Sequence, residues 1–124
     1  MPIEIDLEPE VQKAIEDLEK EVEQEVRDLV IEFLELLMDY TPVDTGLLRN
    51  NWNVSLFFPD SRKLPLNNDP VERAKSTLEG YRAGISVYVT NGQDYARIID
   101  EGGPNRPAHM MVERALADIE SRHR

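Results

Sequence analysis

The chain has no cysteine, only two histidines and few aromatic residues among its 124 positions. Without cysteine it can form neither a disulfide nor a thiolate metal site. No apolar run approaches the roughly 20 residues of a membrane-spanning helix, and the acidic start MPIEIDLEPE is unlike the basic start of a signal peptide. We therefore expect a soluble protein, made in the cytoplasm, that does not bind membranes.

Basic residues are also scarce, with 14 lysines and arginines against 25 acidic residues and a formal net charge of −11. The imbalance lies entirely in residues 1–40, which hold 14 acidic and three basic side chains, whereas the charges of residues 41–124 cancel. Nucleic-acid binders neutralise phosphates with clustered lysine and arginine. The composition therefore argues against a general nucleic-acid binder.

A long helix is predicted for residues 9–40, after a lead segment of residues 1–8. Proline suits the first helical position, and the apolar residues that follow recur at steps of three and four, which keeps them on one face. They are Val11, Ile15, Leu18, Val22, Val26, Leu29, Phe33 and Leu37. This face widens in the second half, which should pack on a sheet. In the first half it is one residue wide among glutamates, and it either completes the domain's own core or packs on a neighbouring subunit.

The long helix should give way to a tight turn and then a strand. Pro42 disfavours helical geometry at the residue before it, so the helix should end near Tyr40. Asp44 can cap a short new turn, and Gly46 allows a sharp bend. From residue 50 the apolar period becomes two, which indicates a half-buried strand. Trp52 is either its largest core anchor or an exposed interface aromatic.

The rest of the chain predicts further helices and a second strand. Residues 59–69 form a polar loop, residues 70–81 a short helix and residues 85–90 a strand, and Pro107 should open a final helix. The predicted fold is α+β, with a long N-terminal helix packed on a small, mostly antiparallel sheet, a short middle helix and a C-terminal helix. We expect one domain, in which residues 41–124 form the α+β body.

The stretch YARIIDEGGPNRPAHMM is the best candidate for a contact surface. Its arginines can meet carboxylates across a subunit boundary, and its glycines allow close backbone approach. One methionine of the pair must face away from the core, where it suits an adaptable contact. The candidate interface residues are Arg97, Glu101, Arg106, His109 and Met110.

A catalytic interpretation of the same stretch is less favoured. A histidine near a carboxylate, as in His109 and Glu101, could bind a metal or act as an acid–base pair. The other histidine, His123, lies at the end of the chain, and no HExxH, GxSxG or P-loop spacing occurs. We expect no enzyme, no cofactor and no metal. Glu101 should cap the glycine loop or pair with Arg106, and His109 should lie at a loop or interface.

Four motifs follow one another in a fixed order: PVDTG-L-LR-N-W, a strand ending in TN, YA-x-I-x-E-G and RPAHMMV-x-x-AL. This arrangement resembles the neck and tail-completion proteins of tailed bacteriophages, the minor tail or head–tail joining proteins. The chain departs from that pattern in its very acidic first helix and in the inserted residues 67–81. The matched positions are Pro42, Val43, Asp44, Thr45, Gly46, Leu48, Arg49, Trp52, Thr90, Asn91, Tyr95, Ala96, Ile99, Glu101, Gly102, Arg106, Pro107, Met111 and Ala115.

The resemblance implies a non-enzymatic virion protein that assembles as a ring, hexameric by analogy, at the head–tail junction and helps to join the tail to the head. The implied partners are further copies of the chain and tail-terminator, tail-tube or head–tail connector proteins, with DNA only as passing cargo. The alternative, based on charge alone, is an acidic adaptor or nucleic-acid mimic that binds a basic partner through residues 9–39.

Overall fold

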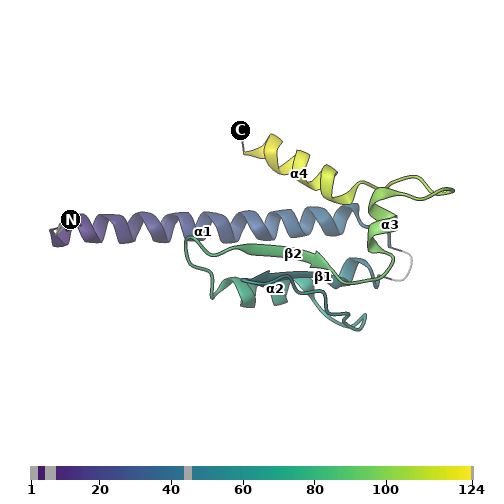
Figure 1. The fold of residues 1–124 in the computed structure, drawn as a ribbon, viewed down its shortest axis with the longest axis horizontal. Helices are drawn as coiled ribbons and strands as arrows, with labels where there is room; N and C mark the ends of the chain where they lie inside the picture. The colour runs from purple at the N-terminus through teal and green to yellow at the C-terminus, as the bar shows by residue number, and fades with distance from the viewer. Residues whose placement is uncertain (1–2, 5–7, 44–45, 124) are drawn as a thin grey trace.

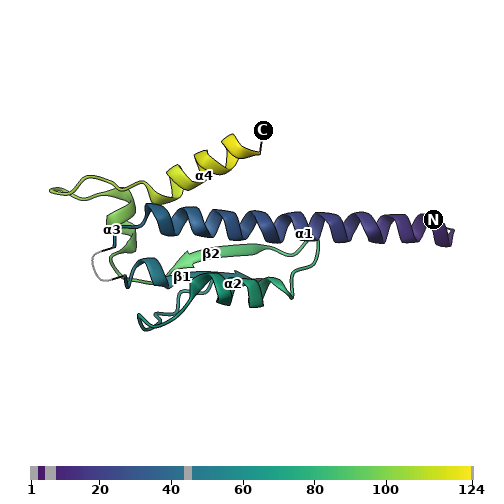
Figure 2. The same cartoon turned by 180° about the vertical axis from the view of Figure 1, so that it is seen from behind.

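The computed structural model describes residues 3–4, 8–43 and 46–123 (Figure 1). The α+β prediction is confirmed, with a two-stranded antiparallel sheet. In Figures 1 and 2, α4 lies along one side of α1, and the sheet and α2 lie on the other. The elements are α1 (Pro9–Tyr40), the 3-10 helix η1 (Arg49–Asn51), β1 (Trp52–Leu56), α2 (Pro70–Leu78), β2 (Val87–Asn91), α3 (Ala96–Glu101) and α4 (Met111–Arg122).

Helix α1 has the predicted bounds. Pro9 takes the first helical position, and Thr41 has an extended backbone with φ −83° and ψ 126°, as expected for a residue before proline. Gly46 is in the left-handed region, with φ +80°. The predicted cap at Asp44 and the central part of the lead segment fall outside the described residues.

The core lies between the second half of α1, the sheet and α2. Leu34 and Leu37 of α1 are buried together with Trp52 and Val54 of β1. Trp52 is 5% exposed, so its interpretation as a core anchor is confirmed. Its indole Nε1 donates a 2.9 Å hydrogen bond to Oγ1 of Thr41, which itself donates a 2.6 Å bond to the Leu37 carbonyl. This chain of bonds ties the start of the sheet to the end of α1.

Helix α4 begins later than predicted, at Met111 and not at Pro107. The amides of His109 and Met110 donate to the carbonyls of Ile99 and Asp100, so this segment is held against α3 and cannot start a helix. Met110 has a left-handed backbone, with φ +53°. The side chain of Asp100 then accepts a 3.2 Å hydrogen bond from the Val112 amide in the first turn of α4.

Three other predicted boundaries were also wrong. Helix α2 stops at Leu78, because Arg27 of α1 donates 2.8 Å hydrogen bonds to the carbonyls of Leu78 and Tyr81. Strand β1 stops at Leu56, because Phe57 takes a left-handed backbone with φ +70°. Phe58, which a continued alternation would place on the same face as Trp52, is 78% exposed. Strand β2 starts two residues late, since the Ile85 amide is used in a turn to Arg82.

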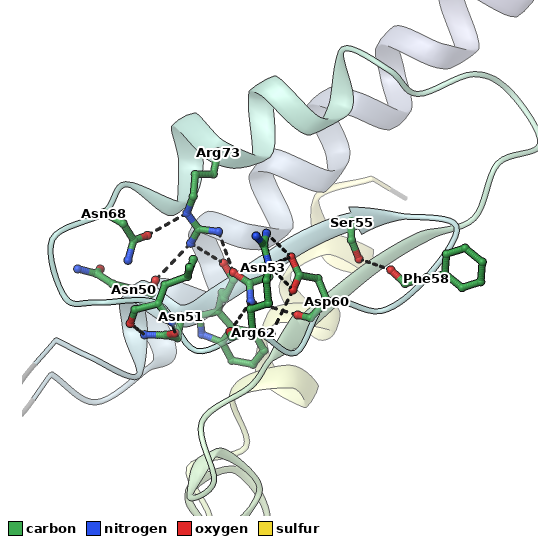
Figure 3. A network of polar contacts seen from close by, with 11 residues as sticks. Asn50, Asn51, Asn53, Ser55, Phe58, Asp60, Arg62, Asn68 and Arg73 are labelled. Atoms are coloured by element: carbon green, nitrogen blue, oxygen red, sulfur yellow. Dashed lines mark hydrogen bonds and ion pairs between the residues drawn. The ribbon is translucent and has the colours of Figure 1, made fainter.

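A polar network holds the loop of residues 57–69 against β1 (Figure 3). The buried Asn53 donates to the carbonyls of Asp60 and Arg62, both at 3.1 Å, and accepts a 2.7 Å bond from Arg73 of α2. Asn51 exchanges hydrogen bonds with the backbone of Leu64. The two asparagines are themselves buried, and bonds to the backbone of Asp60, Arg62 and Leu64 satisfy their polar groups while they hold the loop against β1.

Replacement of Thr41 by valine should destabilise the protein by about 1–3 kcal/mol, because the buried Trp52 N–H would lose its acceptor. Urea unfolding followed by tryptophan fluorescence measures the change. Thr41→Ser keeps the hydroxyl and is the matched control, which should lose much less. Equal stability of the valine variant and the parent would show that the hydrogen bond between Trp52 and Thr41 does not stabilise the fold.

The end of α4 is bound to α1 through Glu32, which lies 3.0 Å from Nη1 of Arg122 and 2.9 Å from Nε2 of His123. The hydrogen bond with His123, followed by that with Arg122, holds the pKa of the Glu32 carboxyl below its usual value of 4.5. A lowered pKa means that this contact stabilises the fold above about pH 4.5 and is lost as pH falls through the lowered value.

An NMR titration should therefore give Glu32 a pKa below 4.5, and Arg122→Gln should raise it because one charged donor is removed. Arg114→Gln is the control, since Arg114 stacks on the Tyr40 ring at 5.7 Å and not on Glu32. An ordinary pKa for Glu32 in the parent protein would show that the end of α4 is not held in this way.

Candidate functional site

The glycine loop, residues 102–110, extends from α3 at the end of the molecule opposite to the N-terminus of α1 (Figure 1). Gly103 and Arg106 exchange backbone hydrogen bonds of 3.0 and 3.2 Å, which close a tight turn. Gly102 has φ +85°, and a Cβ there would lie 2.9 Å from the Ala108 amide nitrogen. Only glycine fits this position, so the backbone presents the Arg106 side chain in a defined place.

The predicted contact residues gather at this end, with one difference in pairing. Glu101 pairs with Arg97, one helical turn away, at 3.2 Å, and not with Arg106 as predicted. The Arg106 residue is exposed, and within residues 46–123 and the other described ranges its side chain makes no hydrogen bond or ion pair. Its guanidinium is therefore available to a carboxylate of another molecule.

His109 and Met110 lie where the loop meets α4. The His109 ring nitrogen Nδ1 is buried without a hydrogen-bond partner among the described residues, and Met110 is 39% exposed. The described part of the chain contains no cluster of three or more histidine, cysteine or acidic residues that could hold a metal. Contact of these residues with another subunit stays a prediction.

Besides Met110, three large apolar residues of α3 and α4 are exposed. We define the α3–α4 surface as Ile98, Met110, Val112 and Leu116, which are 53, 39, 36 and 46% exposed. Val112 and Leu116 are one helical turn apart on α4, and Ile98 lies beneath Gly103. On the same helix Met111 and Ala115 are fully buried and Ile119 packs against the core, whereas Leu116 remains exposed.

The first half of α1 carries a second exposed apolar surface, which extends beyond the rest of the molecule (Figures 1 and 2). We define the α1 stripe as Val11, Ile15, Leu18 and Val22, which are 45, 42, 61 and 49% exposed. Such exposure contradicts the interpretation that these residues complete the chain's own core. A hollow of about 230 Å³ lies between this stripe and Ala83.

An acidic groove of about 470 Å³ lies between α1, α2 and the end of α4. Its acidic side chains recur along one face of α1, at Asp28, Glu32, Glu35 and Asp39. Lys75 and Arg122 stand at its borders. The groove could accept a basic segment, as the adaptor alternative requires.

In the described ranges, no helix has the length and apolar character needed to cross a membrane.

Residues 5–102 match the profile of a family described as "Bacteriophage HK97-gp10, putative tail-component". No curated protein and no solved structure matches the chain. The matched region runs from the lead segment through α3 and contains the α1 stripe, both strands and the start of the glycine loop. The chain therefore belongs to the HK97-gp10-like family of bacteriophage tail components.

Proposed function

We propose that this chain is a neck or tail-completion protein, a non-enzymatic component of the virion that assembles as a ring at the head–tail junction and helps to join the tail to the head. Its membership in a family of phage tail components supports a virion role. The observation that carries the finer assignment is the pair of different exposed apolar surfaces, the α1 stripe and the α3–α4 surface, at opposite ends of the molecule.

Two different patches are what a ring subunit requires, because each copy offers one patch to the next and receives the other from the copy before. The partners we propose are other copies of this chain and a tail-terminator, tail-tube or connector protein. DNA is passing cargo. The acidic α1 suits such a passage, since like charges repel within a Debye length of about 8 Å at physiological salt.

Native mass spectrometry over a concentration series should reveal a closed ring, of about six subunits from the resemblance to phage neck proteins. Arg106→Glu should shift it to monomers, because the free guanidinium becomes a carboxylate that repels the acidic neighbour. Lys75→Glu makes the same change of charge on α2, away from the glycine loop, and should leave the ring intact. If both variants assemble to the same extent, Arg106 is not part of the interface.

Deletion of the gene from its phage should yield filled heads and separate tails in electron micrographs. Complementation with the parent gene should restore joined particles, whereas the Arg106→Glu gene should not. Joined, infectious particles without the protein would rule out the neck role. Absence of the protein from purified complete particles would instead favour an adaptor whose basic partner occupies the acidic groove.

A further inference from the structure

We propose that the α1 stripe of one copy packs against the α3–α4 surface of the next copy, so that the subunits join head to tail. This inference rests on the proposed function and specifies the contact that would build the ring. In this arrangement the two apolar surfaces make the main contact between copies, and Arg106 of one copy pairs with an acidic residue on the first half of α1 of the other.

The α1 stripe continues a face that already binds a helix. Along α1 the same spacing leads from Leu18 and Val22 through Leu29 to Leu36, in the half of the helix that α4 contacts. The exposed fraction falls along that path, from 61 and 49% through 36% to 6%. The uncovered part therefore has the chemistry of an established helix–helix contact but lacks a second helix to cover it.

The distribution of charge indicates which surface of a second copy can pack on the α1 stripe. Residues 9–25 carry seven acidic and two basic side chains, so two α1 stripes placed against each other would bring like charges together. Residues 95–116 carry three of each sign. Of these, Asp100 accepts the Val112 amide, Glu101 pairs with Arg97 and Arg114 stacks on Tyr40. Glu113 and Arg106 remain, both exposed, so the surface has no net charge. The α3–α4 surface is thus apolar and open to an acidic helix.

The positions of the two surfaces determine the kind of assembly. The first half of α1 protrudes at one end of the longest axis, and α3 with the glycine loop lies at the other end, from which α4 runs back along α1 (Figure 1). A contact between unlike patches leaves one patch of each kind free in any open pair. Addition therefore continues, and it ends in a ring when the rotation between successive copies closes.

The absence of cysteine permits a direct test, because an introduced thiol is the only one in the chain. Leu18→Cys and Leu116→Cys are prepared separately, mixed at a concentration where the parent protein is oligomeric, and treated with a short bis-maleimide. We expect dimers that contain one of each variant. The double variant should give a ladder of crosslinked species that ends at the ring size. The matched control is Leu18→Cys mixed with Ser76→Cys, which places the second thiol at an exposed position of α2.

A mixed crosslink of 18 with 116 that exceeds the control by tenfold or more supports the proposal. Crosslinking mainly between two Leu18→Cys copies, a yield no greater than that of the control pair, or a parent chain that stays monomeric throughout overturns it.

A second measurement separates this inference from the proposed function. Leu18→Glu should dissociate the oligomer in sedimentation velocity, whereas Gln24→Glu adds the same charge to another face of α1 and should not. Circular dichroism confirms that both variants are folded. If Leu18→Glu still forms rings while deletion of the gene leaves heads and tails unjoined, the packing proposal fails and the neck role stands.

Discussion

The burial of the second half of α1 on two sides is the constraint on which the rest of the structure depends. Leu34 and Leu37 are almost fully buried, the sheet and α2 lie on one side of this segment, and α4 lies on the other. Neither a two-stranded sheet nor a 12-residue helix is stable by itself in water. The sheet and α4 both pack on helix α1, and the Trp52–Thr41 hydrogen bond fixes the position at which the sheet contacts this helix.

Periodicity and proline positions were enough to predict most of the elements. The bounds of α1 follow from Pro9 and Pro42, and the alternation after residue 50 correctly indicated a strand anchored by Trp52. The start of α4 could not be predicted in this way, because the His109 and Met110 amides bond to carbonyls of α3. The early end of α2 likewise depends on Arg27, which is more than 50 positions away in the sequence.

The contact surfaces were harder to predict than the fold. A helical period shows that Val112 and Leu116 share a face with Ile119, but not how much of that face a neighbouring helix covers. For the same reason the α1 stripe allowed two interpretations, which the exposed fractions of its residues in the structure separate. Arg97 and Glu101 were both expected at the contact surface, with Glu101 capping the glycine loop or pairing with Arg106. The i, i+4 geometry instead pairs them with each other, and the Arg106 side chain has no partner among the described residues.

The uneven distribution of charge gives assembly a direction. If the net charge of −11 were spread over the whole surface, every contact between copies would carry a similar repulsion. Because it lies within residues 1–40, a contact between the two first halves of α1 is strongly repulsive, whereas a contact between unlike ends meets a balanced surface. Repulsion thus disfavours a symmetric dimer, in which both stripes would be buried against each other and no further copy could be added. In the proposed ring the apolar stripe supplies the attraction between copies, and every acidic helix follows the next in the same sense.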